Sequence, residues 1–294
     1  MTPAERISTR LGTIPGGTFD TYVRAIAPAL ERYLPNKVNV IPTNIEGGNQ
    51  AKAMNTVYRA KPDGYTICIV DIPGALLPQV INNPPPAYDL RKFTWLASIG
   101  SDPYGLAVNG ASPIKTIDDL RKLGRPVKLT TTGPGTTSYM VARIATDAMG
   151  IPSTNISGYR SSSEYAIGAI RGDGDGTVAV VPILQKYRDS GDLRPIVMLA
   201  TKSPFPGIAD TVQLGYPELA SLSIRRLVGA PPGMPAETRK ILQDALLKAM
   251  NDPVTIKVMD AAGAAMQPED GDTAARILSE SFDFYNKYKK FIEQ

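Results

Sequence analysis

Short apolar runs alternate with amphipathic stretches along most of the chain. Apolar runs bounded by turn residues are typical of buried strands, and apolar residues at helical spacing are typical of helices. The repeated order of strand and helix favours an α/β fold with parallel or mixed sheets and right-handed crossovers. We expect strands at residues 7–14, 38–42, 65–70, 94–101, 106–109, 127–132, 154–157, 177–181, 193–200 and 225–229, and helices at residues 18–34, 47–60, 116–123, 136–149, 161–171, 183–190, 236–250, 253–262 and 273–292.

The chain is long enough for two domains of ordinary size. It has 294 residues, of which 43% are apolar and 20% are charged, close to the values of an average globular protein. No apolar run approaches the roughly 18–20 residues of a membrane-spanning helix. The formal net charge of +4 is spread along the chain without a Lys/Arg block, so we expect no nucleic-acid partner. A slight positive field would attract anions, although ordinary surface charge gives the same balance.

The chain contains no histidine, and this excludes several classes of site. Ser-His-Asp and Cys-His catalytic arrangements need a histidine, as do histidine-based metal sites. The single cysteine, Cys68, lies in an apolar run, and we interpret it as a small buried apolar residue rather than a nucleophile. The segment Asp173-Gly174-Asp175-Gly176 resembles the start of a calcium loop but lacks the later ligands, so we expect a tight turn there. We therefore expect no metal, no cofactor and no enzymatic activity.

Three expected strand-to-helix turns share a composition that suits anions. They lie at residues 15–20, 132–138 and 158–163, and each combines glycine or hydroxyl residues with the start of a helix. In open α/β sheets, ligands bind at the carboxyl ends of strands, where such turns lie. Free N–H groups at a helix start attract anions, and glycine lets an anion approach the backbone. The same side chains are also ordinary helix N-caps, and this alternative stays open for each turn, most of all for Asp20.

Five short motifs in this order resemble the substrate-binding proteins of tripartite tricarboxylate transporters, the TctC or Bug family. Pro15-Gly16-Gly17-Thr18-Phe19-Asp20 is similar to that family's P-G-G-x-x-D, and Lys61-Pro62-Asp63-Gly64-Tyr65-Thr66 to its A-x-P-D-G-Y-T. Ser157-Gly158-Tyr159-Arg160-Ser161 stands where the family has V-P-Y-K-G. Ala230-Pro231-Pro232-Gly233-Met234-Pro235 is similar to its A-P-A-G-T-P, and Asn251-Asp252-Pro253 to its A-D-P. The motifs span nearly the whole chain.

The resemblance implies a two-lobe periplasmic binding protein fold of type II character. Two mixed sheets flanked by helices are then joined by two crossing strands, with a ligand cleft between lobes that close by hinge motion. We expect residues 1–103 and 226–294 to form the first lobe and residues 104–225 the second. Met1–Arg10 lacks the apolar segment of a signal peptide, so the residues alone allow either a cytoplasmic protein or a processed one. The resemblance implies the second case, a periplasmic protein whose leader has been removed.

The resemblance also implies which residues bind the ligand. In such relatives the first Gly-Gly turn holds one carboxylate through backbone amides and water, and the second lobe contributes through its own turns. The chain departs from the family by having Ser138-Tyr139 where a histidine is often found, and an arginine where an aromatic residue usually precedes A-P-A-G. Arginine offers a bidentate fork for a carboxylate. The expected ligand-binding residues are Gly16, Gly17, Thr18, Phe19, Asp20, Asp71, Ile72, Thr132, Gly133, Thr136, Thr137, Ser138, Tyr159, Arg160, Ser161, Val181, Pro182 and Arg225.

Three functions are compatible with these residues. The first is a carrier that captures a small organic carboxylate, a di- or tricarboxylate or an aromatic acid, for a membrane permease. The second is a sensor of the same fold that presents its ligand to a membrane receptor. The third is an enzyme on a two-lobe scaffold, which would have to work without histidine, a nucleophilic cysteine or an evident metal site. We expect the first.

Overall fold

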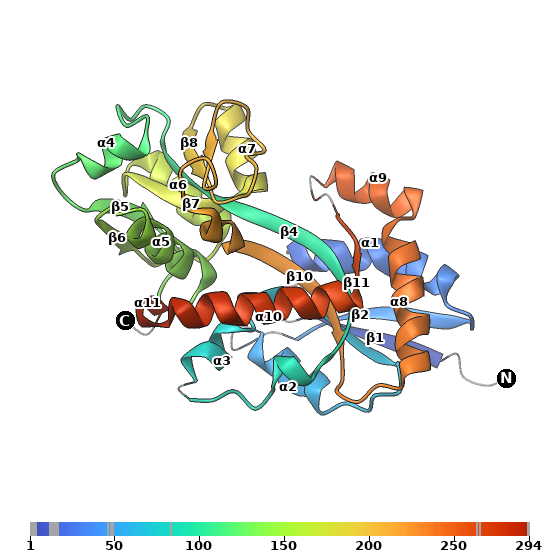
Figure 1. Ribbon diagram of the computed structural model, residues 1–294. Coiled ribbons are helices and arrows are strands. Elements are labelled where there is room, and N and C mark those ends of the chain that lie inside the picture. The colour runs from blue at the N-terminus through green and yellow to red at the C-terminus, as the bar shows by residue number, and fades with distance from the viewer. Residues whose placement is uncertain are drawn as a thin grey trace. The chain divides into compact units, whose positions relative to one another are not determined.

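The computed structural model describes residues 5–11, 18–45, 47, 50–82, 84–262, 264 and 266–292. Its chain divides into two compact units. The first contains the described residues up to Ser101 and the segment Arg225–Asn286, and the second contains Asp102–Ile224 and the described residues from Lys287 onward. Two strands, β4 (Thr94–Asn109) and β10 (Ser223–Ala230), continue from one unit into the other (Figure 1).

The first unit is built on a mixed sheet in the order β2-β1-β3-β10-β4, with β11 paired to β4. Strand β1 pairs in parallel with both β2 and β3, whereas β10 runs antiparallel to β3. Parallel neighbours need crossover connections, which here are helices α1 and α2. The remaining strands of this unit are β1 (Glu5–Leu11), β2 (Val38–Asn44), β3 (Thr66–Ile72) and β11 (Glu269–Asp270).

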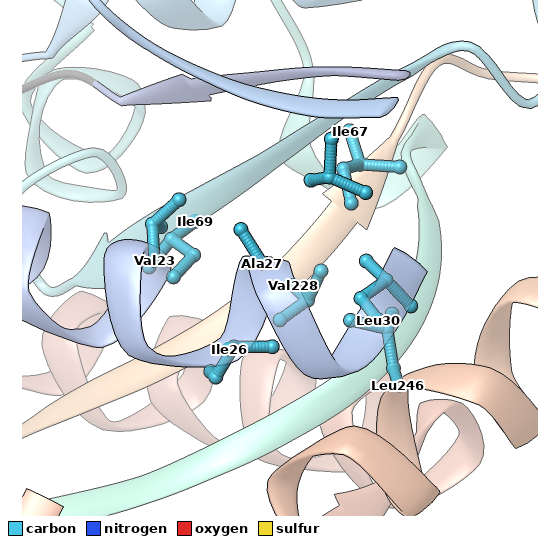
Figure 2. Close-up of a pocket in the computed structure, with 9 residues that line it drawn as sticks. Val23, Ile26, Ala27, Leu30, Ile67, Ile69, Val228 and Leu246 are labelled. Atoms are coloured by element: carbon cyan, nitrogen blue, oxygen red, sulfur yellow. The ribbon is translucent and has the colours of Figure 1, made fainter. Parts of the chain in front are cut away.

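The core of the first unit lies where α1 meets the sheet and α8. Tyr22, Ile26 and Leu30 recur at helical spacing along α1, and each is at most 4% exposed. Figure 2 shows a small apolar cavity lined by side chains of α1, β2, β3, β10 and α8. Its volume of about 20 Å³ is too small for an organic ligand. The helices of this unit are α1 (Thr18–Tyr33), α2 (Ala51–Tyr58), α3 (Leu77–Ile81), the 3₁₀ turn η1 (Leu90–Lys92), α8 (Ala236–Met250), α9 (Pro253–Ala261) and α10 (Gly271–Lys287).

The second unit has its own mixed sheet, in the order β6-β5-β7-β4-β8-β9. Strand β5 is parallel to both β6 and β7, and β4 is antiparallel to β7 and β8. Its strands are β5 (Val127–Thr130), β6 (Ser153–Ile156), β7 (Gly176–Val180), β8 (Leu193–Met198) and β9 (Ala209–Asp210). Its helices are α4 (Ile117–Arg121), α5 (Thr137–Ala148), α6 (Ser162–Arg171), α7 (Val181–Asp189), η2 (Pro217–Ser221) and α11 (Lys289–Ile292).

Several expected elements differ from the structure, most clearly the strands at 94–101 and 106–109 and the helix at 273–292. The strands expected at 94–101 and 106–109 form the single strand β4, because Pro103 and Gly105 adopt extended backbone there and pairing with β7 begins at Tyr104. The helix expected at 273–292 ends at Lys287, and a separate short helix, α11, follows. Among the described residues, no helix is long and apolar enough to cross a membrane.

Cys68 is fully buried in β3. Its Sγ donates to the carbonyl oxygen of Gly229 at 3.4 Å, and burial raises the pKa of the thiol to about 12. A thiol held protonated in this way is a poor nucleophile. The interpretation of Cys68 as a buried apolar residue is confirmed.

Candidate functional site

The carboxyl ends of β1 and β3 lie side by side in the first unit. Leu11, the last residue of β1, is level with Ile69 of β3, so β3 extends past it to Asp71 and Ile72. The expected ligand residues Gly16 and Gly17 lie outside the described residues, and of Thr18 only the backbone is described, as the first residue of α1. This edge of the sheet therefore carries Asp71 and the start of α1, as expected for a site at strand ends.

Asp20 connects the first turn of α1 to the end of β2. Its carboxylate is buried and accepts hydrogen bonds from Arg24 Nε at 2.8 Å and from Asn44 Nδ2 at 3.2 Å. Both oxygens are thus used to fix the local structure. This arrangement supports the alternative in which Asp20 holds the first turn in shape.

Asp71 lies opposite a buried arginine on the neighbouring strand. Arg226 of β10 stands directly opposite Asp71 in the antiparallel register, and paired residues share one face of a sheet. The guanidinium carbon of Arg226 lies 4.6 Å from the ring centre of Tyr22 and 5.3 Å from that of Phe19. Arg225, the expected ligand residue, pairs with Ile72 and therefore faces the other side of the sheet. Arg225 is half-buried, and its side chain makes no hydrogen bond or ion pair within the described part of the chain.

The pKa of Asp71 is raised to about 6. Burial is the main cause, and it outweighs the opposing effects of Arg226 and of a hydrogen bond from the Gln50 side chain. The Gln50 side chain also accepts the backbone N–H of Asp71 at 3.1 Å, and Gln50 itself has a φ of 73°. Sequence reasoning missed Gln50, because no local pattern marks a glutamine at this conformation before a helix.

In the second unit, three hydroxyl groups of the turn before α5 bond to one another. Thr132 Oγ1 lies 2.5 Å from Thr136 Oγ1 and 2.7 Å from Ser138 Oγ, and Thr136 Oγ1 donates to the Gly133 carbonyl at 2.6 Å. Ser138 Oγ also accepts the backbone N–H of Thr132 at 3.1 Å. Because each hydroxyl has only one proton, this chain uses all three, and the hydroxyls are positioned within the turn.

As a result, the first turn of α5 lacks a side-chain cap. Thr136 occupies the N-cap position, but its hydroxyl is turned to Gly133 and accepts none of the helix N–H groups. The backbone N–H groups of Thr137, Ser138 and Tyr139 have no acceptor among the described residues. Free N–H groups at the positive end of a 12-residue helix are suited to an anion.

The turn before α6 is capped. Ser161 Oγ accepts the backbone N–H of Glu164 at 3.2 Å, and the Glu164 carboxylate accepts the N–H of Arg160 at 2.8 Å. Tyr159 donates its hydroxyl to Asp173 at 2.7 Å, while the Arg160 side chain is exposed. Ser161 is therefore the N-cap of α6, which is the alternative that the sequence left open for this turn. The two turns adjoin, since the N–H of Gly158 donates to the Thr132 carbonyl at 3.1 Å.

Two further expected residues, Val181 and Pro182, begin a helix. The sequence pattern placed Val181 at a strand end, but β7 stops at Val180 and both residues belong to the first turn of α7. Proline is tolerated there because the first N–H groups of a helix have no partner within it. Val181 is half-buried and packs against the core of the second unit.

The segment with two aspartates and two glycines is a tight turn, as expected. Asp173 pairs with Arg171 and Tyr159, while Asp175 accepts two bonds from Arg125, both at 2.7 Å. These partners hold the pKa of both carboxyls below the usual range. In the described part of the molecule, no group of three or more cysteine or acidic side chains is placed to hold a metal ion.

Comparison with known proteins gives consistent matches over most of the chain. The sequence model of the tripartite tricarboxylate transporter family receptor, TctC, matches residues 23–294. A UPF0065 protein of Bordetella bronchiseptica is 27% identical over 279 residues, which cover 92% of this chain and 80% of that protein. A TctC solute binding protein from Polaromonas superposes with a TM-score of 0.82 at 19% identity, over 98% of each chain.

A second solved structure, of R. palustris Rpa4515 with adipate, has a TM-score of 0.77 at 20% identity, over 99% of this chain and 98% of that one. These superpositions confirm the expected α/β fold of periplasmic binding proteins. The match to the family confirms the resemblance carried by the five motifs.

Proposed function

Because the chain belongs to the TctC family, the receptors of tripartite tricarboxylate transporters, we propose that it captures a small organic carboxylate in the periplasm and delivers it to the membrane permease of such a transporter. The ligand class is a di- or tricarboxylate or an aromatic acid. The presence of adipate, a dicarboxylate, in the related R. palustris protein supports this class.

The uncapped start of α5 is the observation that carries the proposal. A helix that begins with Thr or Ser normally uses that hydroxyl as a cap, as α4 does with Thr116 and α6 does with Ser161. At α5 the hydroxyl is committed elsewhere, and three N–H groups are left without an acceptor among the described residues. A carboxylate is one of the anions that satisfy such donors.

The proposal assigns different tasks to the expected residues. The N–H groups of Thr137 and Ser138 bind one carboxylate, and the hydroxyl chain that begins at Thr132 keeps the turn in position. In the first unit, the half-buried Arg225 is a separate candidate donor for an anion. Capture needs no chemical step, so the ligand is released unchanged.

A thermal-shift screen against mono-, di- and tricarboxylates, followed by calorimetry on each hit, tests the proposal. Ligand at 100 times its Kd stabilises the folded state by about 2.7 kcal/mol, which should raise Tm by several degrees. The matched control for each acid is its diamide or methyl ester, which has the same skeleton without the charge. Stabilisation by the acid and none by its control supports the proposal. No shift with any acid, from a folded protein, rejects it.

A further inference from the structure

The outermost strand of the second unit's sheet has an open edge. Strand β6 stands at the end of the strand order and pairs with β5 alone among the described strands (Figure 1). The carbonyls of Pro152 and Ile156 accept N–H groups from the β5 side, at 2.8 and 2.9 Å. Successive residues of a strand direct their backbone groups to alternate edges, so Ser153 and Asn155 direct theirs away from β5. These outward N–H and C=O groups have no partner in the part of the chain that the structure describes.

The side chains of β6 leave this edge uncovered. Ser153 Oγ lies 2.6 Å from Thr146 Oγ1 of α5. Asn155 Nδ2 donates to the Tyr139 carbonyl, also in α5, at 2.9 Å. Edge strands are commonly protected by lysine, by proline within the strand or by being very short. Strand β2, at the edge of the first unit's sheet, contains Pro42, whereas β6 has only its length of four residues as protection.

A groove of about 450 Å³ is lined by residues 153–155 of this strand. Its other walls are α5, the loop before β6 and Phe291 of α11, and all of these belong to the second unit. A volume of this size is in the range of ligand pockets. At the groove, Asn155 Oδ1 has no hydrogen-bond partner among the described residues. The amide cannot be reversed, because the Tyr139 carbonyl accepts only from Nδ2.

An extended peptide is the occupant that matches these features. Ser153 and Asn155 are two residues apart in a strand, so their outward groups recur at about 6.7 Å, the repeat of an extended backbone. A peptide strand presents N–H and C=O groups at the same repeat, and its side chains give specificity through adjoining pockets. A small organic acid has no such repeat.

We propose that the open edge of β6 is a docking site for an extended segment of a partner protein. The segment adds to the sheet as a further strand and bonds the outward backbone groups of Ser153 and Asn155. It places a bulky side chain in the groove and a donor side chain next to the Asn155 amide. This surface is a separate site from the carboxylate donors at the start of α5.

Peptide selection on the unliganded protein tests the docking site. The probe is a phage-displayed library of random nine-residue peptides, and each enriched peptide is synthesised and titrated by fluorescence polarisation. We expect Asn155→Pro to weaken binding about fivefold to a hundredfold, because the outward N–H is lost and the peptide carbonyl stays unpaired. Proline is tolerated in an edge strand where the N–H faces outward. Asn155→Ala is the matched control: it removes the side chain but keeps that N–H, so it should lose less affinity.

Amide hydrogen exchange measured by NMR gives a second readout, in the wild type alone. When the peptide binds, the N–H groups of Ser153 and Asn155 should exchange several-fold more slowly. Those of Thr154 and Ile156 point to β5 and should change little. This alternation is the signature of a strand added at the edge, and it decides the question even if Asn155→Pro does not fold.

The proposal fails if no peptide is enriched, if the enriched peptides bind Asn155→Pro as tightly as the wild type, or if the slowed amides lie outside β6. An equal loss in Asn155→Pro and Asn155→Ala would show that the side chain is recognised and not the strand edge. Sedimentation of the protein alone tests another occupant, because a dimer that Asn155→Pro dissociates would show that a second copy covers the edge. Melting curves verify that both variants are folded. These experiments use no carboxylate, so their outcome is independent of the carboxylate screen.

Discussion

A carboxylate side chain introduced at the start of α5 should stabilise the helix and lower the affinity for the ligand. Thr137 is the first residue of α5, half-buried, and its hydroxyl makes no hydrogen bond within the described part of the chain. Thr137→Asp therefore adds a negative charge without disturbing the hydroxyl chain of Thr132, Thr136 and Ser138. If those N–H groups bind the ligand carboxylate, the two anions compete for the same positive potential.

The two effects can be given magnitudes. A negative side chain in the first turn of a helix contributes about 0.3–1 kcal/mol to stability, which corresponds to a rise in Tm of about 1–4 °C. Two carboxylates about 4 Å apart repel by about 1–4 kcal/mol at the dielectric of a protein surface, which is about fivefold to several hundredfold in Kd. Thermal melts of the unliganded variant and calorimetry with the acid found in the screen measure the two quantities separately.

Thr137→Asn is the matched control, because it has nearly the same shape without the charge. Thr137→Asn should bind the ligand with nearly the affinity of the wild type. Raising the salt concentration screens the added charge, so the Kd values of Thr137→Asp and Thr137→Asn should become more similar. An unchanged affinity of Thr137→Asp at low salt would refute the assignment of α5 as the anion site. An equal loss in both variants would point to a steric cause.

Three further outcomes are expected. Ser161→Ala removes the cap of α6 and should lower stability by about 1 kcal/mol in denaturant unfolding while leaving the Kd unchanged; a large loss of affinity would show that Ser161 contacts the ligand. Cys68 should resist thiol reagents in the folded protein and react after unfolding, so rapid labelling of the native state would contradict its burial. Because the pKa of Asp71 is raised to about 6 from 3.8, ionisation disfavours the folded state, and the unliganded wild type should lose about 1–3 kcal/mol relative to Asp71→Asn as pH rises from 4 to 7. A constant difference across that range would show that Asp71 titrates normally.

Much of the fold follows from local patterns in the sequence. Tyr22, Ile26 and Leu30 recur at helical spacing, and the structure buries that face of α1 against the sheet. The alternation of strand and helix likewise predicted parallel pairing, which is present between β1 and β2 and between β5 and β6. These features are predictable because each depends on neighbouring residues alone.

The difference between two similar turns was not predictable in the same way. Thr136 and Ser161 both precede a helix and both carry a hydroxyl, yet only Ser161 caps its helix. The Thr136 hydroxyl finds a competing acceptor in the Gly133 carbonyl, which lies within reach only after the turn has folded. The pairing of Asp71 with Arg226 was also hidden, because it depends on the register of two strands from distant parts of the sequence.

The interrupted first unit constrains the order in which the protein matures. The part of strand β10 that pairs with the open edge of β3 begins at Arg225, after the whole of Asp102–Ile224 in the sequence. During synthesis, which begins at the N-terminus, most of the second unit has been made while β3 still has an unpaired edge. Such an edge can pair with other chains, so the nascent protein is most prone to aggregation before Arg225 emerges. Chaperone assistance during synthesis should matter most in that interval.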